Sequence, residues 1–398
     1  MGKNWKDKWD SGSGRKTKAR DHDSTRQKRV KKRETEGRET GFVVGVSDWD
    51  KVLRQDEEHF LGAVVEVHKR YCFISALDES GEIDTSDVWL ATIARRHLQG
   101  ARKERNFVSV GDVVLCKAAE EHGVADVSED LPSCTVEHRK ERVNALSRID
   151  PLKQELKHVL AANLDQLVIV ASIIDPKVKW GLIDRYLTIA ESESITPVII
   201  LTKKDLYDAS EQKKFKDDVA RKVALYRSLS YDVHLVQANE DAPNESKDLI
   251  RQVFSGKVSV VSGHSGVGKS SIVNLLSPEI EQDVEVDEIF YKGRHTTTYA
   301  SMIRIADRGF VIDTPGIRSF MIEDNPARDL AYYYRDIRPF LGKCKYRECR
   351  HIEEPGCAIR EAVSSGEIEQ WRYKSFLALL LGASGREGRL RDIDIEES

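Results

Sequence analysis

Gly263-His264-Ser265-Gly266-Val267-Gly268-Lys269-Ser270 is the stretch of sequence that decides the central fold. It follows a short apolar run at 257–261 and precedes a helix-like run, Ser271–Leu276. Glycines let the backbone curl so that its N–H groups face a phosphate, and the start of a helix adds a positive dipole end. The spacing therefore predicts a phosphate loop over 263–271, in which Lys269 reaches the β- and γ-phosphates and Ser270 ligates Mg²⁺.

A second motif lies upstream, where Thr202-Lys203-Lys204-Asp205 follows the apolar run 197–201. A carboxylate at Asp205 can accept both N1–H and N2–H₂ of guanine, a pairing that adenine does not offer. The aliphatic stem of Lys203 can cover the base. Position 202 is threonine where the usual motif has Asn, so the sequence does not decide whether this side chain bonds to the neighbouring loops. Ala238, after the strand-like run 232–236, is our candidate for the N–H donor to guanine O6.

The order of the two motifs is informative, because an ordinary GTPase has its phosphate loop first. The reversed order predicts a circularly permuted GTPase. Asp313-Thr314-Pro315-Gly316 ends another apolar run, 309–312, and fits the second switch. There Asp313 is expected to hold Mg²⁺ through water, and the N–H of Gly316 to meet the γ-phosphate.

A first switch is expected at Gly293-Arg294-His295-Thr296-Thr297-Thr298, between the phosphate loop and the second switch. A threonine hydroxyl here could complete the Mg²⁺ shell, and we favour Thr297 or Thr298. Ile317 follows Gly316 where a water-positioning glutamine would be expected. His295 could take that role; a group supplied by a partner, or no side chain at all, are the alternatives. Slow intrinsic turnover is therefore expected.

Three cysteines and a histidine cluster in the pattern Cys344-x4-Cys349-x-His351-x5-Cys357. Three thiolates and an imidazole complete a tetrahedral Zn²⁺ shell with no open position, which is typical of a structural site. We expect one structural Zn²⁺ per chain, which would staple a small helical domain. Lys343, Lys345, Arg347 and Arg350 surround the ligands and either face phosphates or form a solvated surface. The other cysteines, Cys72, Cys116 and Cys134, lie among apolar neighbours and are expected to be buried thiols.

Composition limits the class of protein. At 398 residues, 40% of them hydrophobic, the chain is long enough for two or three domains. It contains neither an apolar run of 18 residues nor a secretion signal, so a cytoplasmic protein without membrane contact is expected, and we expect a monomer. Residues 1–40 hold 14 Lys/Arg and 7 Asp/Glu, whereas the whole chain carries −4. This basic arm either contacts nucleic-acid phosphates or is a solvated tail.

Periodicity predicts the architecture. Short strands separated by turns between about 58 and 140 suit a small β-barrel of the OB type, although another barrel or a sandwich fits nearly as well. Apolar strands that alternate with helices after 166, such as 183–193 and 211–228, predict a parallel sheet covered on both faces. Leu330–Leu341 and Ala358–Leu381 are expected to be helical. We therefore expect a basic disordered arm (1–57), the barrel (58–140), a connector (141–165), the permuted α/β P-loop GTPase domain (166–322), a helical zinc-binding domain (323–385) and an acidic tail (386–398).

Taken together, these motifs resemble the RsgA family, the circularly permuted GTPases that assist small ribosomal subunit biogenesis. The resemblance also includes Leu146-Ser147-Arg148-Ile149-Asp150-Pro151 and Ala161-Ala162-Asn163-Leu164-Asp165-Gln166, and it spans about 58–380. It implies an OB barrel, a permuted GTPase domain and a zinc domain. It further implies GTP hydrolysis stimulated by the small subunit, rRNA contacts from the flanking domains, and release on hydrolysis to GDP.

Two other functions compete with this interpretation. One is a non-catalytic RNA-binding assembly factor whose GTPase domain only senses GTP. Loss of catalytic activity is disfavoured because the chain keeps Lys269, Ser270, Asp313 and Gly316. The other is an ATP-using P-loop enzyme, against which Asp205 is the discriminating residue.

Overall fold

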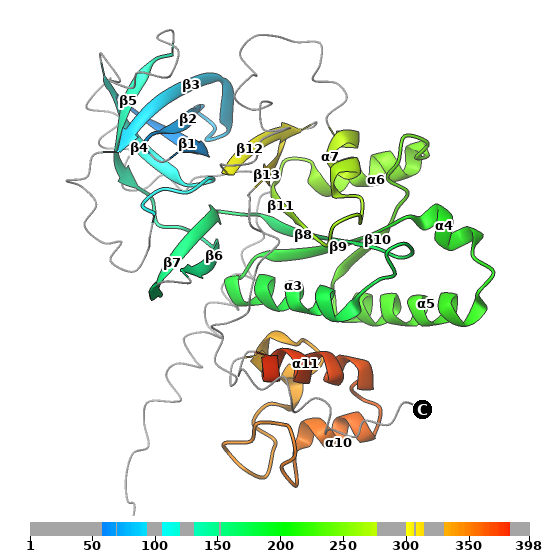
Figure 1. Ribbon diagram of the computed structural model, residues 1–398. Coiled ribbons are helices and arrows are strands. Elements are labelled where there is room, and N and C mark those ends of the chain that lie inside the picture. Colours follow the sequence, from blue (N-terminus) through cyan, green and yellow to red (C-terminus); the bar gives the residue numbers. More distant parts are fainter. Residues whose placement is uncertain are drawn as a thin grey trace, which may run out of the picture. The chain divides into compact units, whose positions relative to one another are not determined.

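The structure is a computed structural model that describes residues 58–68, 70–93, 106–119, 131–150, 153–276, 300–305, 308–313 and 330–382. All of these residues fall within one unit, Phe42–Ser398 (Figure 1). The expected basic arm and acidic tail lie outside the described residues. Among the described residues, no helix is both long and apolar enough to span a membrane.

The N-terminal strands close into a barrel. They are β1 (His59–Val67), β2 (Cys72–Leu77), β3 (Ile83–Ile93), β4 (Val113–Ala119) and β5 (Ser133–Arg139). Their order is β1-β2-β3-β5-β4, and β4 pairs again with β1, so the sheet returns to its first strand. β3 and β5 are parallel and the other pairs antiparallel. This barrel-like sheet agrees with the expected OB-type architecture.

The barrel core explains the scattered cysteines. Cys72, Cys116 and Cys134 are each at most 1% exposed and unbridged, which confirms the expectation of buried thiols. They pack with Val64, Ile74 and other aliphatic side chains inside the barrel. Burial raises the pKa of the Cys72 thiol, so this group stays protonated and inert.

The expected connector is more structured than its sequence suggested. β6 (Ala145–Asp150) and β7 (Lys153–Ala162) form an antiparallel two-stranded sheet. Asn163 Nδ2 donates to the Gly111 carbonyl of the barrel at 2.8 Å. Asp165 Oδ2 accepts from the Val258 N–H of the next domain, also at 2.8 Å. Two polar residues just after the hairpin thus bond this segment to the barrel and to the central sheet.

The central sheet contains β8 (Gln166–Ser172), β9 (Thr196–Thr202), β10 (Asp232–Leu235), β11 (Val258–Ser262), β12 (Ala300–Ile305) and β13 (Gly309–Asp313). Their spatial order is β10-β9-β8-β11-β13-β12. All neighbours are parallel except β12 and β13, which form an antiparallel hairpin. β11, which leads into the phosphate loop, therefore lies at the centre although it comes fourth in sequence.

Helices cover both faces of this sheet, as the alternating pattern predicted (Figure 1). α3 (Trp180–Glu193) and α5 (Lys213–Ser228) bury one set of apolar side chains against one face, including Ile183, Leu187 and Val223. α6 (Asn244–Phe254) and α7 (Lys269–Leu276) bury Phe254 and Ile272 against the other. The short α4 (Lys204–Ala209) follows β9.

The C-terminal segment departs from one prediction. A helix over Leu330–Leu341 was wrong, because the chain forms two 3₁₀ turns there, η6 (Ala331–Tyr333) and η7 (Arg338–Phe340). Tyr334 between them is extended, and Pro339 has no N–H to continue a helix. The run Ala358–Leu381 is helical but divided into α10 (Ala358–Ser364) and α11 (Gln370–Gly382). Gly366, with φ of +80°, lies in the turn that separates them.

A buried ion cluster joins the C-terminal helices to α3. Arg372 of α11 is 1% exposed and donates to Asp184 of α3. It also donates to both carboxylate oxygens of Asp336, at 2.8 and 2.9 Å. Tyr226 of α5 donates to the same Asp184 carboxylate at 2.6 Å. A guanidinium buried with these acceptors fixes α11 against α3 and α5.

Candidate nucleotide and metal sites

The guanine-motif candidates lie at the carboxyl end of β9. Lys203 has a left-handed backbone (φ +61°) that turns the chain from β9 into α4. The Lys204 N–H donates to the Val236 carbonyl at 3.1 Å, which brings the end of β10 alongside this turn. Ala238 follows two residues later and is buried. The segment around Ala238 and the turn around Asp205 therefore lie next to each other, although 33 residues separate them in the sequence.

Thr202 links this turn to the phosphate loop. Its hydroxyl donates to the Val267 carbonyl at 2.6 Å, and the residue is 1% exposed. Its methyl group lies 3.6 Å from where a Cβ on Gly268 would be. The threonine thus makes a bond to the neighbouring loop that the sequence left open.

The phosphate-loop candidates follow β11 and lead directly into α7. Gly263 approaches β8 so closely that a Cβ would lie 2.1 Å from the Val170 carbonyl oxygen, which excludes any side chain there. Gly266 and Gly268 have φ of +79° and +93°, a region that favours glycine. The Lys269 ammonium donates to the carbonyls of Gly263 and His264 at 2.9 and 2.7 Å. It therefore lies over the loop, while Ser270 is exposed at the start of α7.

Asp313 is the last residue of β13. β13 runs parallel to β11, with Ile312 opposite Val260. Because parallel strands end at the same edge of a sheet, Asp313 lies at the edge from which the phosphate loop emerges. Gly316 and the first-switch candidates His295, Thr297 and Thr298 lie outside the described residues.

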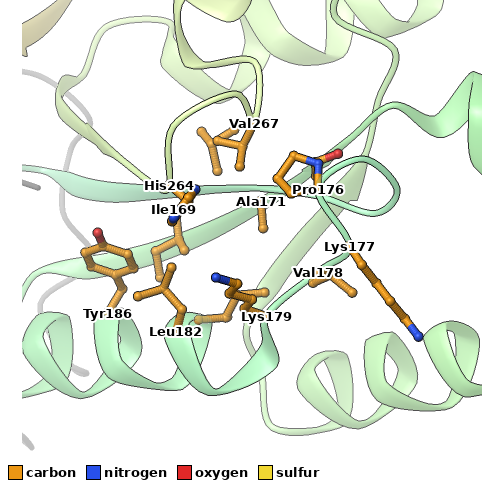
Figure 2. A pocket seen from close by; sticks show the side chains of 13 residues that line it. Ile169, Ala171, Pro176, Lys177, Val178, Lys179, Leu182, Tyr186, His264 and Val267 are labelled. Carbon is orange, nitrogen blue, oxygen red and sulfur yellow. The ribbon is translucent and has the colours of Figure 1, made fainter.

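An apolar pocket adjoins the phosphate loop on the α3 side of the sheet (Figure 2). Ile169 and Ala171 of β8, Leu182 and Tyr186 of α3, and Val267 line it. His264 also lines it and is labelled in Figure 2. A triphosphate requires N–H and cationic donors on all sides, so this mostly apolar hollow is not the phosphate cradle itself.

The four metal-ligand candidates come together in space. Ligand atoms of Cys344, Cys349, His351 and Cys357 all lie within 4.8 Å of one another. His351 Nδ1 is 3.5 Å from the sulfurs of both Cys344 and Cys357, which are themselves 3.9 Å apart. A tetrahedral Zn²⁺ with bonds of about 2.0–2.3 Å separates its ligands by roughly 3.3–3.8 Å. The donor set and its spacing therefore fit Zn²⁺.

Without metal, Cys349 and Cys357 favour the protonated thiol and His351 favours the neutral imidazole. Burial raises the pKa of the Cys349 thiol to about 12 and also raises that of Cys357. Burial lowers the pKa of His351. A metal must therefore displace thiol protons but finds the imidazole already neutral, so binding releases protons.

The backbone around the ligands is organised by two side chains that sequence analysis missed. Glu354 accepts the N–H groups of Arg350 and Ile352 at 3.0 Å and of Glu353 at 3.2 Å. Partial burial alone would raise the pKa of Glu354, but these backbone donors hold it at about 2. Tyr373 of α11 donates to the His351 carbonyl at 2.7 Å. Neither residue belongs to a ligand pattern, so nothing in the sequence signalled them.

Comparison with known proteins agrees with this geometry. The chain is similar to the crystal structure of YloQ, a circularly permuted GTPase, with a TM-score of 0.60, 27% identity, and coverage of 83% of this chain and 97% of that one. It is also similar to YjeQ from Thermotoga maritima, with a TM-score of 0.59, 25% identity, and coverage of 82% and 99%. Fold and site thus define a circularly permuted GTPase.

Sequence relatives identify the family. The model of the RsgA GTPase family matches residues 139–323. A small ribosomal subunit biogenesis GTPase RsgA from Bacteroides fragilis is 36% identical over 295 residues, 74% of this chain and 89% of that protein. One from Chlorobaculum tepidum is 38% identical over 281 residues, 69% and 85% of the two chains. The chain belongs to the RsgA family, as the motifs predicted.

Proposed function

We propose that this chain hydrolyses GTP and acts in late assembly of the small ribosomal subunit, which it leaves on hydrolysis. The observation that carries the nucleotide assignment is the 2.6 Å bond from Thr202 to the Val267 carbonyl. It joins the guanine motif and the phosphate loop into one site. The ribosomal assignment rests on the relatives, which are named small ribosomal subunit biogenesis GTPases.

Within this site we assign roles to residues. Asp205 reads guanine, with Lys203 against the base and the Ala238 N–H on O6. Lys269 leaves the loop carbonyls for the β- and γ-phosphates, and the backbone N–H groups of 263–271 hold the β-phosphate. Ser270, Asp313 and either Thr297 or Thr298 would hold Mg²⁺, which neutralises charge that develops on the phosphates.

Water activation is assigned to His295, with Gly316 at the γ-phosphate. Single-turnover hydrolysis by His295→Ala, measured with small subunits present, is expected to be at least about 100-fold slower than wild type. An unchanged rate would remove the histidine from the mechanism.

The C-terminal cluster is proposed to hold one structural Zn²⁺, because its four ligands leave no open position. The surface beside it supports RNA contact. Tyr346 is 47% exposed, and the Lys345 ammonium lies 5.6 Å from its ring centroid. Lys343, Arg347 and Arg350 add positive charge to the same loop. Exposed aromatic rings among cations can stack bases and contact phosphates. We also propose a cytoplasmic monomer.

GTP turnover with and without small subunits tests the function. Stimulation by the subunit is expected; no hydrolysis in either condition would favour a non-catalytic RNA-binding factor. Asp205→Asn tests the nucleotide, because an amide should shift preference from guanine toward xanthine nucleotides. Unchanged GTP affinity in that variant would contradict the guanine assignment.

A further inference from the structure

We propose that the β-barrel reads the nucleotide state through the β12–β13 hairpin, with Thr85 and Glu82 of the barrel as positioning residues. The inference rests on the proposed function, because the hairpin joins the two segments assigned as switches. β12 begins at Ala300, two residues after Thr298, and β13 ends at Asp313. Ser301 is opposite Asp313 in the ladder, so both switch segments leave the hairpin at the same end.

The barrel pairs with the hairpin at this end. Val67 of β1 is opposite Ala300, and Glu66 is opposite Ser301. These pairs make one continuous sheet of barrel and GTPase strands. The edge of β1 therefore bonds to the first residues after the first switch.

The far end of the hairpin is also held. Arg304 of β12 donates to the Thr85 hydroxyl of β3 at 2.7 Å in a partly buried contact. Arg308, in the hairpin turn, donates to both carboxylate oxygens of Glu82, at 3.0 and 3.2 Å. The Arg308–Glu82 pair is solvent-exposed and is expected to be weak, so Arg304–Thr85 is the more informative contact.

Packing connects the same parts. Met302 of β12 and Ile312 of β13 share a buried apolar cluster with Val65, Val88 and Leu90 of the barrel. A slip of β12 by one residue would turn Met302 out of this cluster, because side chains alternate along a strand. The hairpin and barrel are therefore expected to shift together when the γ-phosphate is lost.

Linkage makes this coupling reciprocal. If GTP and GDP favour different hairpin positions, a ligand that displaces the barrel must change the relative affinity for the two nucleotides. An RNA partner bound to the barrel would then change nucleotide affinity without contacting the nucleotide site.

Hydrogen exchange of the full-length protein tests the proposal, with GDP and then with a non-hydrolysable GTP analogue. Peptides covering 59–68 and 82–90 are expected to differ between the nucleotides by about fivefold or more in exchange rate. In Arg304→Met this difference should fall below about twofold, while GDP affinity stays near wild type. Arg251→Met on α6 is the matched arginine control and should retain the full difference.

Thr85→Val removes the same hydrogen bond with a smaller change and serves if Arg304→Met unfolds. Suppose calorimetry shows that both nucleotides bind, yet the barrel exchanges at the same rate in both states. That result would overturn this inference and leave the proposed function intact. A full nucleotide-dependent difference in both Arg304→Met and Thr85→Val would also overturn it. If neither nucleotide binds, the proposed function fails and the inference fails with it.

Discussion

At the scale of the residue, Thr202 shows how a departure from a motif can preserve a contact. The threonine hydroxyl is short, but β9 ends close enough to the phosphate loop for it to reach the Val267 carbonyl. The bond is buried, so its loss leaves an acceptor without a donor, which typically costs about 1–3 kcal/mol.

Thr202→Val is therefore expected to weaken GDP binding about tenfold, because valine matches threonine in shape but cannot donate. Thr202→Ser keeps the hydroxyl and is the control, with affinity near wild type. Isothermal titration calorimetry measures both. Wild-type affinity in Thr202→Val would mean that the bond does not stabilise the loop.

Glu354 acts at the same scale on the metal loop. Its carboxyl has a folded pKa of about 2 against an ordinary value of 4.5. A carboxyl group whose pKa is lowered by folding stabilises the folded loop at pH values above its ordinary pKa. This stabilisation is lost as pH falls from 4.5 toward 2.

At pH 7, Glu354→Gln is therefore expected to melt at a lower temperature than wild type, and this gap should narrow below pH 4.5. Thermal unfolding of metal-free protein, kept with a chelator from pH 7 to 3.5, measures it. Glu348→Gln, in the same loop, controls for the general loss of one charge. A constant gap across this range would exclude the carboxylate as its cause.

At the scale of the element, the turn from β11 into α7 depends on close packing against β8. The 2.1 Å separation between a Cβ on Gly263 and the Val170 carbonyl involves backbone on both sides, so no side-chain rotation can relieve it. This close approach explains why the motif needs glycine at position 263, independently of phosphate binding.

Gly263→Ala is expected to displace the loop and weaken nucleotide binding by about 100-fold or more, because loop N–H groups lose their positions. Gly256→Ala is the control: its φ is +61°, but nothing lies within 4 Å of the added methyl group. Nucleotide affinity and melting temperature of both variants check this. Equal losses in the two would point to glycine flexibility rather than close approach.

At the scale of the whole molecule, the contacts distinguish two attachments. The barrel bonds to the hairpin between the proposed switches, whereas α11 bonds through Arg372 to Asp184 of α3, which Tyr226 of α5 also contacts. In the sequence, the segment after Asp313 leads toward the metal-ligand candidates at 344–357. The contacts of the barrel with the β12–β13 hairpin connect the barrel more directly to the proposed switches.

Arg372→Met is expected to destabilise the protein by about 3–5 kcal/mol, because it leaves the buried carboxylate of Asp184 and the nearly buried side chain of Asp336 without a counter-ion. Arg221→Met is the control, since its partner Glu369 is half-exposed and such pairs contribute about 0–1 kcal/mol. Chemical denaturation measures both. Adding Asp184→Asn to Arg372→Met should recover part of the loss; no recovery would argue against an unpaired charge as the cause.

The sequence by itself determined the class of the protein and its nucleotide and metal motifs. Each phosphate-loop, guanine and metal pattern needs residue types at short fixed spacings, and such local requirements are readable along the chain. Most strands and helices of the central domain were predictable for the same reason, since apolar runs and helical periods are local. The 330–341 helix was not, because a proline and an extended tyrosine override the apolar pattern.

Only the tertiary structure decided how these parts are joined. The Thr202–Val267 bond spans 65 residues, Arg304–Thr85 spans 219, and Arg372–Asp184 spans 188. No periodicity connects residues so far apart, because their contact depends on how whole strands and helices pack. The sequence therefore specifies the chemistry of each site, and the packing of buried polar side chains specifies which domain each site can influence.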